Sequence, residues 1–68
     1  MKVTINNAAI ELNGSSHSLE MAISQSGVKD FKGLAIAVNN VVIPRTTWDA
    51  FNLKENDSVT IIRATQGG

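Results

Sequence analysis

A chain of 68 residues without a cysteine has to hold its fold by burying hydrophobic side chains, because no disulfide can cross-link it. A domain of this size buries only about 60% of its unfolded surface, so almost every apolar segment must contribute to one core. Hydrophobic residues make up 43% of the chain and charged residues 18%, as in globular proteins. The sequence therefore predicts one small domain without thiolate nucleophiles, iron–sulfur clusters or cysteine-ligated zinc.

The charges are balanced and scattered, with six Lys and Arg against six Asp and Glu. Such a chain has no overall field to attract phosphate backbones or anionic lipids, so we expect no nucleic acid and no membrane among its partners. No apolar run approaches the ~20 residues of a spanning helix, and residues 1–4 lack the apolar core of a signal peptide. We expect a soluble, cytoplasmic protein.

The first segments predict an antiparallel hairpin. Residues 2–5 and 9–12 both alternate polar and apolar side chains, which is typical of strands with one buried face. Asn6 and Asn7 stand between them, and asparagine tolerates the positive φ that tight hairpin turns require.

One short helix follows the hairpin. Ser18 is a suitable N-cap, and Leu19, Ala22 and Ile23 have the i, i+3, i+4 spacing of one helical face. Gly27 is suited to end the helix. Two turns are too few for a stable isolated helix, so we expect its apolar stripe to cover one face of a sheet.

A second hairpin is predicted from residues 34–38 and 41–43, which are joined by Asn39 and Asn40 and followed by Pro44. The run 34–38 is almost continuously apolar, which indicates burial on both faces or a position deep in the sheet. Periodicity alone would also allow a helix here, but the β-branched residues favour a strand.

The last third predicts one helical turn, a polar turn and a final strand. Residues 46–51 resemble a helical turn with a threonine cap that places Trp48 and Phe51 on one side. Trp48 is expected in the core or at its edge, and the alternative is a direct partner contact. Residues 54–57 form the polar turn, and residues 58–64 the strand. The predicted order is strand, strand, helix, strand, strand, turn, strand.

The chain stops at Gly67-Gly68. An extended segment without side chains can enter a slot too narrow for any Cβ and carry the terminal carboxylate into an enzyme's active site. Fully extended, residues 65–68 reach at most about 14 Å, which is enough to enter a cleft while the domain stays outside. The alternative is a frayed terminus without function.

Five sequence features, together with this order of elements, resemble the ThiS family, the sulfur carrier proteins of thiamine biosynthesis. They are Val38-Asn39, Ile43-Pro44-Arg45, Trp48, Asp57-Ser58-Val59 and Gly67-Gly68. The chain departs from the family's usual Val-Pro-Arg and Gly-Asp at Ile43 and Asn56. The resemblance implies an α+β, ubiquitin-like β-grasp fold with a mixed sheet of about five strands on one main helix. Residues 1–64 would form this domain, and residues 65–68 a flexible C-terminal tail.

The resemblance also implies a chemistry located at Gly68. A partner adenylating enzyme of the E1 type would use ATP and Mg²⁺ to adenylate the Gly68 carboxylate, and a persulfide donor would convert it to a thiocarboxylate. Thiazole synthase would take the sulfur. The chain would then be a protein co-substrate and not an enzyme, and it would bind no cofactor itself, since it has no Gly-rich phosphate loop.

The candidates for partner binding include Gln66 and Gly67 in the tail and Arg63 close to it. Ile62 is predicted on the sheet face opposite Val59 and Ile61. There it would either join an apolar docking patch with Ala35, Ala37 or Val42, or be covered by the loop carrying Trp48 and Phe51. Arg45 is either a partner contact or a solvated surface charge.

No catalytic or metal site is predicted within the chain. Ser15, Ser16, His17 and Ser18 lie too close in sequence for a nucleophile–base pair, and they have no orienting carboxylate nearby. A single histidine does not make a metal site.

Other functions remain open on sequence alone. The small subunit of molybdopterin synthase uses the same diglycine chemistry with another acceptor. A β-grasp docking module would not use its terminus, and a protein modifier would conjugate to lysine.

Overall fold

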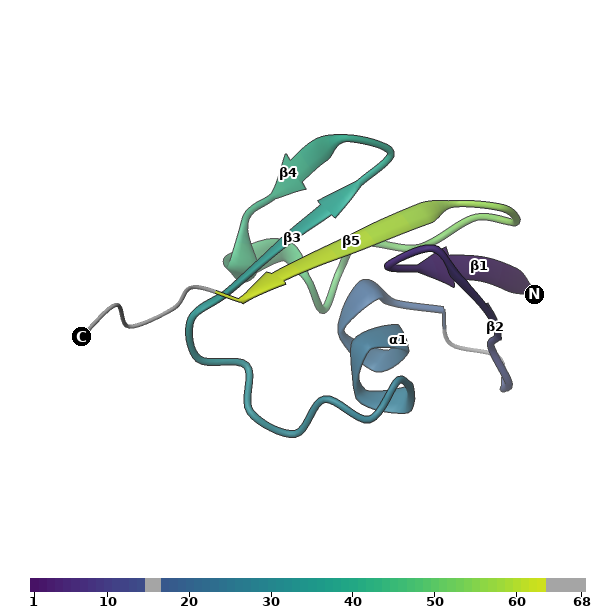
Figure 1. Cartoon of the computed structure of the whole chain (residues 1–68), viewed down its shortest axis with the longest axis horizontal. Coiled ribbons are helices and arrows are strands. Elements are labelled where there is room, and N and C mark those ends of the chain that lie inside the picture. The colour runs from purple at the N-terminus through teal and green to yellow at the C-terminus, as the bar shows by residue number, and fades with distance from the viewer. Residues whose placement is uncertain (15–16, 64–68) are drawn as a thin grey trace.

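The computed structural model describes residues 1–14 and 17–63. It contains a five-stranded sheet and one α-helix (Figure 1). The elements are, in chain order, β1 (Lys2–Ile5), β2 (Ala8–Glu11), α1 (Leu19–Gln25), β3 (Leu34–Val38), β4 (Val41–Ile43), a 3₁₀ turn η1 (Arg45–Thr47) and β5 (Ser58–Arg63). The predicted order of elements is confirmed, and the strand bounds shift by about one residue, whereas the helical turn predicted over residues 46–51 is the shorter η1.

The sheet is mixed, with strand order β2-β1-β5-β3-β4. β5 lies in the middle, antiparallel to β3 over five residue pairs and parallel to β1 over two. The last strand in sequence is therefore the central strand in space. This order brings the two hairpins, β1–β2 and β3–β4, to opposite sides of β5.

Both hairpins turn through an Asn-Asn pair, as predicted. Asn6 and Asn7 have φ of 51° and 70°, and Asn39 and Asn40 have the same two values. Asparagine is one of the few side chains that adopt this left-handed region readily.

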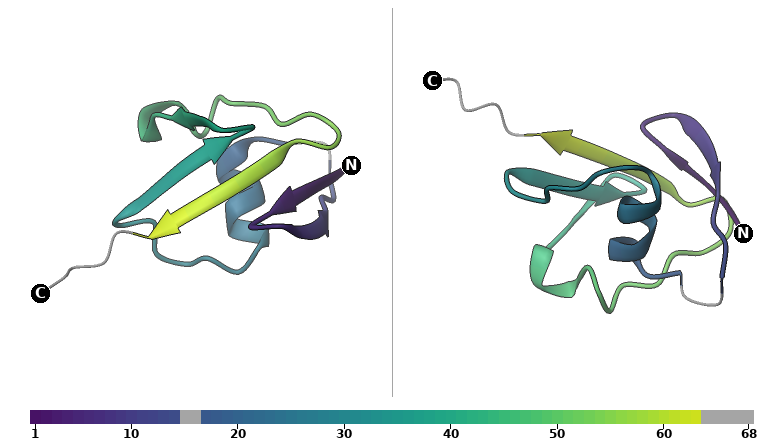
Figure 2. Two further views of the ribbon diagram at one scale, coloured as in Figure 1. Left: turned by 45° about the horizontal axis from the view of Figure 1, so that its top comes forward. Right: turned by 90° about the horizontal axis from the view of Figure 1, so that it is seen from below.

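Helix α1 begins and ends at the residues that the sequence indicates. The Ser18 hydroxyl accepts a hydrogen bond from the Met21 N–H at 3.2 Å, and Gly27 follows the helix with φ +101°. Leu19, Ala22 and Ile23 are buried. Figure 2 shows that α1 and η1 lie on the same face of the sheet and leave the other face open.

The core lies between α1 and the sheet, and Trp48 is one of its largest side chains at 2% exposed. The Trp48 Nε1–H donates to the Ile43 carbonyl at 2.8 Å, and Phe31 meets the indole ring edge-on at 6.0 Å. The predicted core position of Trp48 is confirmed.

The run 34–38 lies deep in the sheet, one of the two predicted alternatives, because β3 lies between β5 and β4. The other alternative, burial on both faces, is wrong for part of the run. Ala35 is exposed, and in the next strand Val41 and Val42 are 60% and 69% exposed. Ile36 and Val38 face the helix and are buried, whereas Ala35 and Val42 lie on the open face, which neither α1 nor η1 covers.

The predicted threonine cap at residues 46–51 is also wrong. The turn begins at Arg45, directly after Pro44, and no side chain caps it. Pro44 has φ −59°, the value that its ring imposes and that a tight turn needs. The Thr47 hydroxyl instead donates to the Pro44 carbonyl at 2.8 Å.

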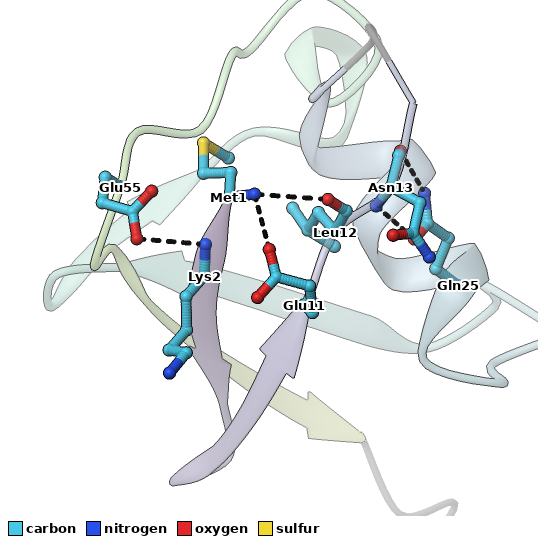
Figure 3. Close-up of polar contacts among 7 residues, drawn as sticks. All are labelled: Met1, Lys2, Glu11, Leu12, Asn13, Gln25 and Glu55. Atoms are coloured by element: carbon cyan, nitrogen blue, oxygen red, sulfur yellow. Dashed lines mark hydrogen bonds and ion pairs between the residues drawn. The ribbon is translucent and has the colours of Figure 1, made fainter.

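Polar contacts tie the beginning of the chain to the rest of the fold (Figure 3). The Met1 amino group donates to Glu11 Oε2 at 2.7 Å, and the Lys2 N–H donates to Glu55 Oε2 at 3.2 Å. The Met1–Glu11 hydrogen bond raises the pKa of the amino group and lowers the pKa of the Glu11 carboxyl. The two strands of the first hairpin are thereby joined at the end opposite their turn.

Candidate functional site

The central strand β5 carries two of the three predicted partner-binding residues that the structure describes. Ile62 and Arg63 are its last two residues, and both are exposed. β5 ends on the side of the molecule opposite the N-terminus (Figure 1). Gln66, Gly67 and Gly68 lie outside the described residues, as do Ala64 and the predicted tail as a whole.

The structure brings Ile62 together with other apolar side chains on the open face of the sheet. Ile62 pairs with Ala35 across β5 and β3, and Val42 pairs with Ala37 across β4 and β3. Ile62 is 54% exposed and Val42 69% exposed. We call Ala35, Val42 and Ile62 the sheet patch.

The alternative in which the Trp48 loop covers Ile62 is wrong. Trp48 is buried in the core on the helix side, and Phe51 is half-buried against the same core. Adjacent side chains of β5 point to opposite faces, so Val59 and Ile61 face this core while Ile62 points away from it. The sheet patch is therefore open to a partner.

Arg45 lies on the other side of the sheet from the patch, at the start of η1. Its guanidinium carbon is 5.9 Å from the centre of the Trp48 ring, a cation–π contact. The side chain is exposed. Its role in partner binding stays a prediction.

Sequence reasoning missed a groove at the end of β5. Its volume is about 400 Å³, and it is lined by Ile5, Asn6, Ala8, Ile10, Ser26, Val28, Ile61 and Arg63. We call it the hairpin groove. These residues come from four separate segments, and the parallel pairing of β1 with β5 brings the first hairpin beside the end of β5. No local pattern in the sequence indicates the pairing of β1 with β5.

The residues weighed as catalytic form no site in the described part of the chain. His17 is half-buried, and its carbonyl accepts a hydrogen bond from the Leu53 N–H at 2.8 Å. Ser15 and Ser16 lie outside the described residues. Within residues 1–14 and 17–63, no three His, Asp or Glu side chains gather as metal ligands. None of the helices in these ranges has the length and apolar character needed to cross a membrane.

Two solved structures are similar to this chain over its whole length. One is the crystal structure of the thiamine biosynthesis protein ThiS from Geobacter metallireducens, with a TM-score of 0.82, 23% identity and full coverage of both chains. The other is a solution structure of a thiamine biosynthesis protein from the same organism, with a TM-score of 0.75 and 23% identity. It covers all of this chain and 88% of the other. These likenesses confirm the ubiquitin-like β-grasp fold. A search of curated proteins found no match.

The match to a family model extends beyond the strands and the helix to the C-terminal diglycine. The model of the ThiS family matches residues 3–68, which takes in Gly67 and Gly68. The resemblance carried by Ile43-Pro44-Arg45, Trp48 and Asp57-Ser58-Val59 is thereby confirmed. The chain belongs to the ThiS family.

Proposed function

We propose that this chain is a sulfur carrier of thiamine biosynthesis, and that the carboxyl group of Gly68 is its reactive group. The observation that carries this proposal is the family match, which runs from residue 3 to the terminal diglycine. The position of β5 also supports it. β5 lies in the middle of the sheet and is paired with β3 up to Arg63, so the sheet anchors the start of the segment that follows at one end of the molecule.

The carboxylate has to be activated first, because it is anionic and has no good leaving group. A partner adenylating enzyme would bind ATP and Mg²⁺, and a Gly68 oxygen would attack the α-phosphorus with loss of pyrophosphate. The partner's metal ion and basic groups would stabilise the charge on the phosphates. The product is an acyl-adenylate whose leaving group is AMP.

Sulfur would then enter from a persulfide. The terminal persulfide sulfur attacks the Gly68 carbonyl carbon, AMP leaves, and an acyl disulfide forms. A second thiol of the donor system attacks the other sulfur of this disulfide, which releases the thiocarboxylate and leaves the donor oxidised as a disulfide. The chain itself has no cysteine, so both thiols belong to its partners.

The thiocarboxylate would deliver its sulfur to thiazole synthase. In this scheme the chain is a co-substrate that travels between enzymes, and it performs no catalysis of its own. Its membership in the ThiS family favours this acceptor over molybdopterin synthase.

The sheet patch would be the surface on which the adenylating enzyme docks. Its exposed Val42 and Ile62 side chains lie on the face left open by α1, and Ile62 is one residue from the end of β5. Exposed apolar surface of this kind is typical of protein interaction sites.

The direct test is mass spectrometry of the C-terminal peptide after the protein has been incubated with ATP, Mg²⁺ and extract of its source cells. Trypsin cleaves after Arg63 and releases residues 64–68. This peptide has no methionine, whose oxidation would add nearly the same mass as replacement of oxygen by sulfur. We expect sulfur in place of one Gly68 carboxyl oxygen, in an ATP-dependent manner.

Two variants serve as matched controls. Deletion of Gly68 should abolish the modification, and Gly68→Ala should weaken it, because a Cβ no longer fits a slot shaped for glycine. Thiocarboxylate formation at the wild-type level on the shortened chain would overturn the proposal.

A further inference from the structure

The hairpin groove exists because β1 and β5 separate after a short contact. They pair through Thr4↔Ser58 and Ile5↔Val59, and β5 then continues alone on this side to Arg63. Figure 2 shows β5 extending past the end of β1. The groove lies where the two strands separate, and Ser26 and Val28, from the segment after α1, form its remaining wall.

The floor of the groove is apolar and not fully covered. Ile5 is buried, whereas Ile10, Val28 and Ile61 are only half-buried and pack against the edge of the core. At the rim stands Ala8, an exposed residue too small to close the opening. An aliphatic side chain entering the groove would remove these half-exposed groups from water.

The polar side chains that line the groove have mainly donors left to offer. Asn6 Oδ1 accepts from the Ile61 N–H at 2.8 Å, which fixes the amide so that its Nδ2 donors remain. The Ser26 hydroxyl proton is already donated to the Ile23 carbonyl at 2.6 Å. Arg63 is the one charged lining residue, and it makes no ion pair within the described ranges. The groove therefore combines an apolar floor with donors and a positive charge.

We propose that the hairpin groove is a second docking point for the adenylating enzyme, which fills it with an aliphatic side chain and sets a carboxylate against Arg63 and Asn6. This inference rests on the proposed function. The position of Arg63 supports it, since Arg63 stands five residues before Gly68 and that segment spans at most about 18 Å when extended. An enzyme that holds Gly68 in its active site therefore stands within reach of the groove.

The test compares two glutamate substitutions in the same strand. Ala8→Glu puts a carboxylate at the rim, where it fills the opening and pairs with Arg63. Ala9→Glu adds the same charge to the opposite face, because successive residues of a strand point to opposite sides. Both positions are exposed, so both variants should fold, and the dispersion of their amide NMR spectra verifies this.

Each variant is assayed by ATP–pyrophosphate exchange with the adenylating enzyme purified from the source cells. We expect Ala8→Glu to raise the KM for the carrier about tenfold at unchanged kcat, the effect of about 1.4 kcal/mol of lost binding. Ala9→Glu should leave both parameters unchanged. Arg63→Gln should raise KM as well, and the difference from wild type should shrink at high salt. Lys54→Gln, which removes the same charge in the turn before β5, should have no such effect.

A second measurement locates the contact between the chain and the enzyme by NMR, without any enzymatic reaction. The ¹⁵N-labelled chain is titrated with the adenylating enzyme in the absence of ATP, and the amide signals of Ala8, Val28 and Arg63 should shift or broaden. Normal exchange by wild type with no effect of Ala8→Glu, and no change at these amides, would overturn the groove proposal alone. Absence of any exchange with wild type would overturn the proposed function, and the groove proposal with it.

Discussion

The two hairpin turns have the same sequence and the same backbone, yet they hold β5 differently. In each, the first asparagine uses its backbone N–H and its Oδ1 on β5. Asn6 bonds the Val59 carbonyl at 2.9 Å and the Ile61 N–H at 2.8 Å. Asn39 bonds the Ser58 carbonyl at 2.8 Å and the Ser58 N–H at 3.0 Å. The sheet thus holds its central strand by side-chain contacts from both sides.

The two asparagines differ in the partner of the side-chain amide nitrogen, Nδ2. Asn39 Nδ2 donates to Asp57 Oδ1 at 3.0 Å, and the other Asp57 oxygen accepts from the Lys54 N–H at 2.8 Å. Asn6 Nδ2 has no such acceptor within the described residues, and it lies at the hairpin groove. The Asn39 side chain thus has all its partners within the chain, whereas Asn6 keeps its Nδ2 donors at the groove. Under the groove proposal, the same turn would serve stability in one place and binding in the other.

The largest effect on stability is expected for Asn39→Ala. It removes the contacts to Ser58 and Asp57 and places alanine at φ 51°, which together should cost about 2 kcal/mol of unfolding free energy. Urea denaturation followed by Trp48 fluorescence measures this cost. Asn39→Gly keeps the backbone conformation without the side chain, so it separates the lost hydrogen bonds from the strain.

Asn6→Ala should cost less, about 1.5 kcal/mol, because the same strain is combined with the loss of one side-chain hydrogen bond. The same urea experiment applies, and Asn6→Gly is the matched control. A cost equal to or above that of Asn39→Ala would break the comparison, since it would mean that Asp57 adds nothing to the second turn.

Ile62→Glu separates contacts that stabilise β5 from contacts that are proposed to bind a partner. Ile62 is 54% exposed on the open face, so the substitution should change the unfolding free energy by less than about 0.5 kcal/mol. It should nevertheless weaken binding to the adenylating enzyme about tenfold, as measured by calorimetry. Thr60→Glu is the control, an exposed position on the same face of β5 but outside the sheet patch. Loss of the folded state in Ile62→Glu would show that Ile62 is a core residue.

The smallest effect is expected at the tie between Met1 and Glu11, which closes the first hairpin opposite its turn. The hydrogen bond lowers the pKa of Glu11 from its ordinary 4.5, so its stabilisation is present above that pH and is lost as pH falls through the lowered value. It raises the pKa of the amino group from 8.0, so that part is present below pH 8.0 and is lost as pH rises through the raised value.

Glu11→Gln should therefore differ most from wild type between these limits, and the two should converge at both extremes. Unfolding free energies measured across this pH range check the expectation. Because both groups are exposed, the difference should be small and should fall with added salt. If the unfolding free energies of wild type and Glu11→Gln differed by a constant amount over the whole pH range, the Met1–Glu11 pair would not contribute to the pH dependence of stability.

The sequence predicted the parts of the fold that depend on neighbouring residues. Asn6-Asn7, Asn39-Asn40, Ser18 and Gly27 each impose a local backbone conformation, and each turn, cap or helix end was found where it was expected. The cap of η1 was mispredicted because Thr46 and Thr47 gave a stronger cap signal than Pro44, although the proline ring is what starts the turn. The exposure of Ala35 stayed open on sequence alone, because an apolar run does not show whether a second layer covers the sheet.

The candidate site was predictable only where it lies on one strand. Ile62 and Arg63 could be placed at the end of β5 from alternation alone, and the structure confirms the face of Ile62. The hairpin groove requires the pairing of residue 5 with residue 59, a contact between the two ends of the chain. The hydrogen bond from Ile61 to Asn6 spans 55 positions and has no local signature.

The central position of β5 has a mechanical consequence. Under the proposed function, an enzyme that draws Gly68 into a narrow slot would pull along the axis of β5. The hydrogen bonds that join β5 to β3 and β1 run across that axis. They bear the load in shear, all at once, and do not open one after another from the end as a peeled edge strand would. Under the proposed function, the domain could therefore be held by its last residues without unfolding, and the carrier could be bound and released by one enzyme after another.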